Sequence, residues 1–134
     1  MAHVREIAIE SRERNELIKL DKDVAKAITD SGIADGVCHI YIPHTTAGVI
    51  INEGADPDVA RDFLAKLADL VPHEGRYAHA SGNADSHIKA ALVGASAVVL
   101  IKDGVPALGR WQSIFFCEFD GPRRRKVLLR VAES

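Results

Sequence analysis

The 134-residue chain is long enough for one domain with its own core, so we treat residues 1–134 as a single domain. Its net charge of −2 excludes a bulk electrostatic attraction to nucleic acid or to a membrane surface. No apolar run approaches the roughly 18 residues of a membrane span, and the N-terminus lacks an apolar signal region, so we expect a cytoplasmic protein. Cys38 and Cys117 lie inside apolar runs, which predicts buried thiols in a reducing compartment.

The first third of the chain predicts two strands followed by a helix. Residues 3–10 alternate polar and apolar side chains, and residues 16–20 are expected to pair with them as a hairpin. Asp21 is a suitable N-cap for a helix that runs to Ser31, and Gly32 is a suitable residue to end it.

The middle of the chain predicts two strands and a second helix. The strands are expected over residues 36–43 and 49–51, and the second is β-branched and expected to be buried on both faces. Asp56 followed by Pro57 places an N-cap and a proline at the start of a helix that ends before Pro72. The apolar face of this helix is expected to consist of Val59, Phe63, Leu67 and Leu70.

The segment from Ala78 to Lys89 is polar although it lies between two apolar elements, which indicates a site. Asn83 or Ser81 can cap a short helix in this segment, and Gly94 can end it. The core-facing residues of this helix are expected to be Ile88, Ala91 and Leu92. Three more strands are expected over residues 97–101, 113–119 and 123–131.

The order of the expected elements is β-β-α-β-β-α-α-β-β-β. Strands outnumber helices, and short turns join consecutive strands. This order predicts an α+β fold with a largely antiparallel sheet and about three helices, rather than a doubly wound parallel sheet.

Three histidines lie at a strand end, in a loop and at a helix start: His44, His79 and His87. Imidazoles from three separate segments can form an open site for zinc or a similar divalent ion. Their spacing matches none of the common metal motifs. From the spacing alone, structural hydrogen bonds or contact with solvent are the favoured explanation.

Two carboxylates are candidates for chemistry. Glu53 follows a buried strand, where it could act as a general base or a metal ligand, whereas Asp56 is explained as a helix cap. Glu118 interrupts an apolar strand and needs a partner there, which Arg123 or Arg125 could supply.

The basic run after residue 122 places Arg123 and Arg125 on one strand face, where the pair can bind phosphate. The alternative is a solvated edge strand that charge protects from aggregation. Lys89 points away from His87 on a helix but could meet a phosphate at the rim of a site. Trp111 is expected to be a core anchor, with the wall of a ligand site as the alternative.

Three stretches together resemble the YjbQ-like family: residues 44–57, residues 82–89 and residues 108–123. They contain His44-Thr45-Thr46-Ala47-Gly48, Gly82-Asn83-Ala84-Asp85-Ser86-His87-Ile88-Lys89 and Leu108-Gly109-Arg110-Trp111-Gln112. Many members of that family carry the name secondary thiamine-phosphate synthase. The resemblance implies an α+β subunit that assembles as a compact homotrimer, with the polar signature residues in a pocket near the subunit contacts.

The resemblance also implies roles for individual residues. The catalytic residues are expected to be Glu53, His79 and Glu118. The expected substrate-binding residues are Thr45, Asn52, Asn83, Lys89, Trp111, Gln112, Arg123 and Arg125. A divalent metal, zinc or magnesium, would be held by His44, His79 and His87.

Two functions are therefore expected as alternatives. The first is a thiamine-phosphate synthase-like transferase, with Glu53 and Asp56 on Mg²⁺ and Trp111 stacked on the pyrimidine ring of its substrate. The second is a metal- or phosphate-binding trimer that is non-enzymatic, or a metal-dependent hydrolase or lyase. Neither involves nucleic acid or a membrane; a small phosphorylated molecule is the expected ligand.

Overall fold

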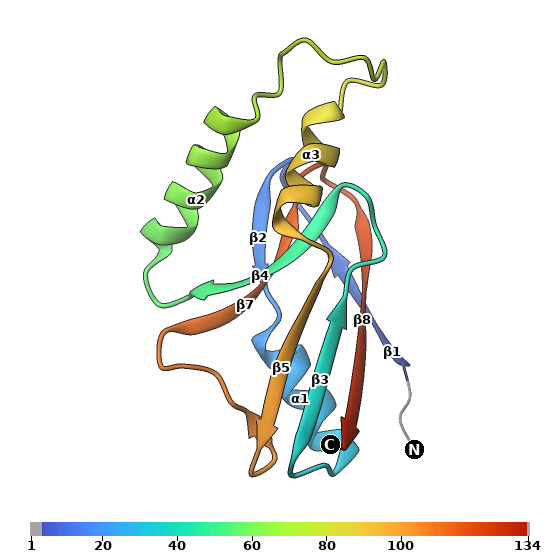
Figure 1. Cartoon of the computed structure of the whole chain (residues 1–134), viewed down its shortest axis with the longest axis vertical. Coiled ribbons are helices and arrows are strands. Elements are labelled where there is room, and N and C mark those ends of the chain that lie inside the picture. Colours follow the sequence, from blue (N-terminus) through green and yellow to red (C-terminus); the bar gives the residue numbers. More distant parts are fainter. Residues whose placement is uncertain (1–3, 134) are drawn as a thin grey trace.

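The computed structural model describes residues 4–133 and arranges them in two antiparallel sheets and three helices (Figure 1). The elements in chain order are β1 (Val4–Glu10), β2 (Glu16–Lys19), α1 (Asp21–Ser31), β3 (Gly36–Tyr41), β4 (Ala47–Glu53), α2 (Pro57–Leu70), α3 (Ala84–Val93), β5 (Ser96–Lys102), β6 (Val105–Pro106), β7 (Gln112–Glu118) and β8 (Arg124–Glu133). The larger sheet has the order β1-β8-β3-β5-β6, and the smaller has the order β2-β7-β4. The expected α+β class, with antiparallel sheets and three helices, is confirmed.

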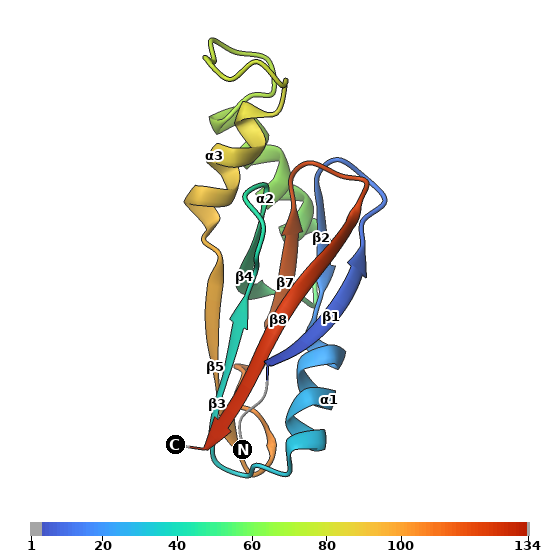
Figure 2. The same cartoon turned by 90° about the vertical axis from the view of Figure 1, so that its right-hand side faces the viewer.

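The smaller sheet forms the middle layer of the molecule, with a core on each of its faces. One face packs on the larger sheet and α1 around residues such as Ile114 and Phe116. The opposite face packs on α2 and α3 around Leu67, Cys117 and Phe119. Figures 1 and 2 show these two helices at one end of the molecule and α1 at the other. Strand β7 is therefore buried on both faces from Ser113 onward.

Local sequence features set two of the helix ends as expected, and the start of α1 differs. Gly32 ends α1 with a φ of 70°, the left-handed conformation in which a side chain would be strained. Asp56 caps α2, because its side chain accepts a hydrogen bond from the Asp58 N–H at 2.9 Å. Asp21 does not cap α1; its carboxylate accepts from the Ile114 N–H at 2.7 Å and so ties the helix to β7.

The expected hairpin between the first two strands is wrong. β1 pairs with β8 in one sheet, whereas β2 pairs with β7 in the other. The polar segment between β1 and β2 crosses from sheet to sheet, and the turn between β7 and β8 crosses beside it. The two crossings are tied by a hydrogen bond from the Ser11 N–H to the Arg123 carbonyl at 3.1 Å. We call this region the sheet corner. Residue 3, the first of the expected strand, lies outside the described residues.

The predicted core face of α3 is also wrong. Ile88 and Leu92 are 40% and 65% exposed, whereas Asp85, Ser86 and Lys89 are buried. The helix thus turns its polar side inward, because an arginine from the sheet corner pairs with Asp85. On α2, Leu70 is exposed and Leu67 is the buried residue.

Strand β4 extends further than residues 49–51 and is less buried than expected, since Val49 is buried and Ile50 and Ile51 are half-buried. The two-residue strand β6 was not predicted. Within residues 4–133, none of the helices combines the length and the apolar composition of a membrane span.

Candidate functional site

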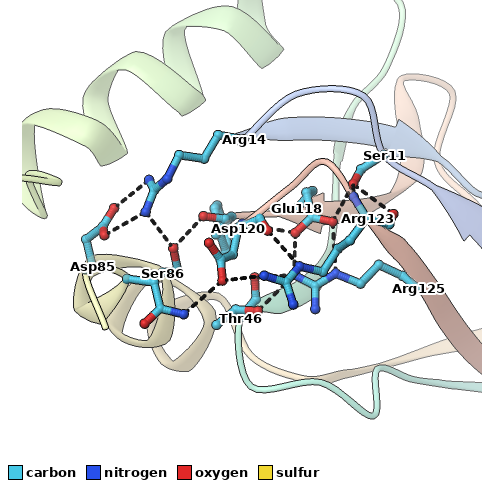
Figure 3. Close-up of polar contacts among 12 residues, drawn as sticks. Ser11, Arg14, Thr46, Asp85, Ser86, Glu118, Asp120, Arg123 and Arg125 are labelled. Carbon is cyan, nitrogen blue, oxygen red and sulfur yellow. Dashed lines mark hydrogen bonds and ion pairs between the residues drawn. The ribbon is translucent and has the colours of Figure 1, made fainter. Parts of the chain in front are cut away.

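A buried ion pair lies at the centre of the sheet corner (Figure 3). The Arg125 guanidinium binds both carboxylate oxygens of Glu118, with Nε to Oε1 at 2.9 Å, and both side chains are almost fully buried. The carboxylate also accepts from the Ser11 hydroxyl at 2.7 Å and from the Asp120 N–H at 3.0 Å. The prediction that Glu118 needs an arginine partner is confirmed, and the partner is Arg125.

These contacts determine the charge of Glu118. Burial opposes the ionised form, but the hydrogen bonds from Arg125, Ser11 and the Asp120 N–H outweigh it and hold the pKa of the carboxyl below its ordinary value. Arg125 extends from this pair to Thr46, whose hydroxyl it reaches at 2.8 Å. The pair thereby joins β8 and β7 to the loop that carries His44 and Thr45.

A second ion pair, between the half-buried Arg14 and the buried Asp85, fixes α3 against the corner. The Arg14 guanidinium donates to both oxygens of Asp85 at 3.1 Å (Figure 3). Lys89 donates to the same carboxylate at 3.0 Å. Burial would raise the pKa of Asp85, but hydrogen bonds from Arg14 and Lys89 lower it to about 2. Ser86 donates to the Phe119 carbonyl at 2.5 Å, which adds a neutral contact between α3 and the residue that follows β7.

A pocket of about 640 Å³ opens between the loop after β3, the start of α3 and the sheet corner. We call it the anion pocket. It is lined by Tyr41, Ile42, Pro43, His44, Thr45, Thr46, Asn83, His87, Ala95, Asp120, Arg123 and Arg125. The structure therefore brings together His44, Thr45, Asn83, His87, Arg123 and Arg125, all of which were predicted as site residues.

The tautomer of His44 follows from one hydrogen bond. The backbone N–H of Lys126 donates to His44 Nε2 at 2.9 Å. Burial and the charge of Arg125 lower the pKa of His44, which favours the neutral ring. In a neutral ring whose Nε2 accepts, the proton is on Nδ1. His44 thus has an N–H to donate to a ligand and no free lone pair for a metal.

Three polar side chains form a chain along the pocket wall. Asp120 accepts from the Asn83 amide at 2.8 Å and from Arg123 Nη2 at 3.0 Å. The Arg123 Nε also donates to the Asp120 carbonyl at 2.8 Å. These bonds leave the two N–H groups of Arg123 Nη1 for a ligand. His79 lies behind Asn83, and its Nε2 is 2.9 Å from the Asn83 Oδ1.

The three predicted metal ligands do not form one set in this arrangement. The rings of His79 and His87 meet edge to face with centroids 5.2 Å apart. Within residues 4–133 no group of three or more His, Cys, Asp or Glu side chains is arranged to hold a metal. His44 would have to give up its bond with the Lys126 N–H to join His79 and His87.

The remaining predicted residues lie at the other end of β4 and β7. Ala47 pairs with Glu118 at the corner, whereas Glu53 pairs with Gln112 six residues further along each strand, a separation of about 20 Å. Glu53 accepts from the N–H groups of Ala55 and Asp56, and Gln112 accepts from the Gly109 N–H. Within one protomer, therefore, Asn52, Glu53, Trp111 and Gln112 are remote from the anion pocket.

Two side chains differ from their expected environments. Trp111 is 57% exposed beside the Arg110 guanidinium, which lies 4.9 Å from its ring, so the expectation of a core anchor is wrong. Lys89 is only 2% exposed and bonds to Asp85, so it is not at the rim of the pocket.

The family model described as "UPF0047 protein YjbQ-like" matches residues 5–134. The chain belongs to the YjbQ-like family. It is similar to the UPF0047 protein MJ1081 of Methanocaldococcus jannaschii, with 48% identity over 92% of this chain and 89% of that protein. It is similar also to YugU of Bacillus subtilis, with 41% identity over 96% of this chain and 98% of that protein.

Solved structures of YjbQ-like proteins have the same fold. A protein from Clostridium acetobutylicum is 44% identical, with a TM-score of 0.94 over 96% of this chain and 99% of that one. A protein from Sulfolobus solfataricus is 28% identical, with a TM-score of 0.95 over 100% and 99% of the two chains. The family resemblance predicted from the three sequence stretches is confirmed, and the names of these relatives state no reaction.

Sequence reasoning missed several residues of this YjbQ-like site. These residues are Ser11, Arg14, Asp85 and Asp120, none of which the sequence alone placed in the site. The sequence does contain one indication: Asp85 and Lys89 are four residues apart on a helix, the spacing of a stabilising ion pair.

Proposed function

We propose that the anion pocket binds a small phosphorylated molecule. The observation that supports this most directly is the hydrogen bond from the Lys126 N–H to His44 Nε2. Because that bond leaves His44 with a donor at Nδ1, the pocket offers N–H groups from His44 and from Arg123 Nη1, together with the hydroxyl of Thr45. Donors of this kind, one of them charged, suit the oxygen atoms of a phosphate.

The charge of the corner supports the same ligand. Arg125 lies at the pocket wall, but its charge is matched by Glu118, so it supports the pocket and is not free to grip a ligand. Arg123 is half exposed, and Asp120 holds only one edge of its guanidinium. Arg123 is therefore the cation that meets the phosphate, and Asp120 orients it.

Calorimetric titration with inorganic phosphate tests this proposal. Arg123→Gln should weaken binding by about tenfold or more, since a charge-assisted hydrogen bond contributes about 1.5–3 kcal/mol. Arg124→Gln is the matched control, because Arg124 is the next residue, is exposed and contacts Glu10 instead of the pocket. Equal phosphate affinity in Arg123→Gln and the wild type would refute the proposal.

A transferase reaction of the thiamine-phosphate synthase type would use this pocket for a phosphate of its substrates. Glu53 and Trp111, which were expected to serve the metal and the ring, would then have to come from a second copy of the chain. Formation of thiamine phosphate from its two phosphorylated halves, with Mg²⁺ present, is the assay. The reaction is rejected if the protein forms no product or if Glu53→Ala is as active as the wild type.

We propose that the second copy belongs to a homotrimer. The outer face of the larger sheet supports association, because it exposes Tyr41, Val98 and Leu100 on β3 and β5. A solvent-facing side of an antiparallel sheet is ordinarily polar, and clustered apolar residues there favour an interface.

Metal binding is the second candidate function, favoured by the contact between the His79 and His87 rings. Zinc suits imidazole ligands better than magnesium does. Metal analysis of protein purified without a histidine tag tests it, and stoichiometric metal that survives His87→Ala would remove His87 from the ligand set.

A further inference from the structure

A second, apolar pocket of about 330 Å³ adjoins the anion pocket. It is lined by Tyr77, Ala78, His79, Ala84, His87 and Ile88. We propose that this apolar pocket receives a flat apolar group, such as an aromatic ring, of the same molecule whose phosphate lies in the anion pocket. The inference rests on the proposed function and narrows the ligand to a phosphate ester with an aromatic or similarly flat substituent.

The two pockets share a wall. His87 lines both of them. Asn83, which lines the anion pocket, is bonded to His79, which lines the apolar pocket, at 2.9 Å. Asn83, the N-cap residue of α3, precedes His87 by one helical turn, and Ala84 and Ile88 lie four residues apart on the adjacent stripe of the helix. A molecule that passes His87 therefore contacts both stripes.

Two polar groups in the lining of the apolar pocket are already engaged. The Tyr77 hydroxyl donates to the Pro72 carbonyl, and His79 Nε2 bonds to Asn83. The rest of the lining is mostly ring and methyl surface, including the mutually perpendicular rings of His79 and His87, whose planes meet at 81°. Such a lining favours an apolar group over a second phosphate.

Ile88 belongs to neither of the two hydrophobic cores of the fold. The helix is held on its opposite side by Arg14, Asp85 and Lys89, and Ile88 stays 40% exposed. The space is sufficient for a ring, since a cavity of about 150 Å³ already accommodates benzene. Ile88 is thus available to contact a ligand, and its substitution should leave the helix in place.

Titration of phenyl phosphate against methyl phosphate tests the inference, since the two esters carry the same phosphate and differ in the ring. In the wild type, phenyl phosphate should bind about tenfold more tightly than methyl phosphate, from apolar area buried. Ile88→Ser, which shortens the wall, and Ala78→Phe, which fills the pocket, should both lose this difference while methyl phosphate affinity is unchanged. Leu92→Ser is the control, because Leu92 is also exposed on α3 but lines neither pocket.

The outcomes separate this inference from the proposed function. If neither ester binds, the proposed function fails, and this inference fails with it. If methyl phosphate binds and phenyl phosphate binds no more tightly, only the apolar pocket is refuted. A tenfold difference that persists in both Ile88→Ser and Ala78→Phe also overturns the inference, because the ring must then lie elsewhere.

Discussion

Glu118→Gln should be among the most destabilising substitutions in the protein. The carboxylate receives hydrogen bonds from Arg125, from the Ser11 hydroxyl and from the Asp120 N–H. Glutamine keeps the shape but replaces one acceptor oxygen with an amide that donates. The substitution therefore turns at least one of these donors toward another N–H and leaves Arg125, which is 5% exposed, as a buried cation without its counter-charge.

The expected loss is about 3–5 kcal/mol, the usual cost of removing one partner of a buried ion pair. That is a large share of the roughly 5–15 kcal/mol by which a domain of this size is stable. The matched control is Glu6→Gln, because Glu6 faces Lys126 at 3.9 Å on the same sheet with both side chains exposed. Exposed pairs of this kind contribute little, so the control should change stability by less than about 0.5 kcal/mol.

Urea denaturation at one fixed protein concentration measures the unfolding free energy of both variants. The slope of this free energy against urea concentration is compared as well, to exclude a change in the denatured state. The double variant Glu118→Leu with Arg125→Met should lose much less than the sum of the two single changes, because no unpaired charge remains. A cost below about 1 kcal/mol for Glu118→Gln, or additive losses in the double variant, would refute the reasoning.

Three further predictions concern charge, thiols and assembly. The carboxyl of Asp85 has its pKa lowered to about 2, so the ionised carboxylate stabilises the fold at pH values above its ordinary pKa, and this stability is lost as the pH falls. The difference in unfolding free energy between the wild type and Asp85→Asn should therefore shrink by about 1 kcal/mol between about pH 6 and pH 3, and a constant difference would contradict this. Burial raises the pKa of the Cys38 thiol to about 11 and raises that of Cys117 as well, so Ellman's reagent should label both only on unfolding, and rapid labelling of the folded protein would be inconsistent with their burial. Light scattering should give three times the chain mass, and Val98→Glu on the exposed sheet face should lower it; a monomer mass for the wild type would remove the trimer.

The sequence predicted the elements with local causes well. Gly32 and the Asp56–Pro57 pair set helix ends through their own conformational preferences, and the structure has Gly32 at the end of α1 and Asp56–Pro57 at the start of α2. The partner of Glu118 was predictable too, because a carboxylate inside an apolar strand has few ways to be tolerated and three arginines follow within seven residues, two of them on one strand face.

The errors have a common physical origin in long-range pairing. The hairpin between β1 and β2 failed because each strand finds its partner more than 90 residues away. The core face of α3 was inverted because Arg14, 71 residues before Asp85, makes it favourable to bury Asp85 and Lys89. Apolar periodicity assumes that charges face solvent, and here the buried Lys89 and the half-buried Arg14 on one buried carboxylate reverse that rule.

The candidate site shows the same division. His44, His87 and Arg123 were selected by residue type and position and Asn83 by the family resemblance, and the structure brings them to one pocket. The sequence carried no information on the roughly 20 Å that separates Glu53 and Trp111 from them, because that separation follows from the register of β4 on β7. Those residues can share a site with His44 only if different protomers supply them.

The position of β8 in the larger sheet has a consequence for how the molecule is made. β8 lies between β1 and β3 in the larger sheet. β1, which is synthesised first, therefore has no strand to pair with until β8, which is synthesised last, has been made. During translation, β1 must therefore wait as unpaired chain while α1, α2 and α3 are already available to form. A ribosome stalled before residue 124 would present a nascent protein with the middle of its main sheet missing, and with Glu118 still without its arginine.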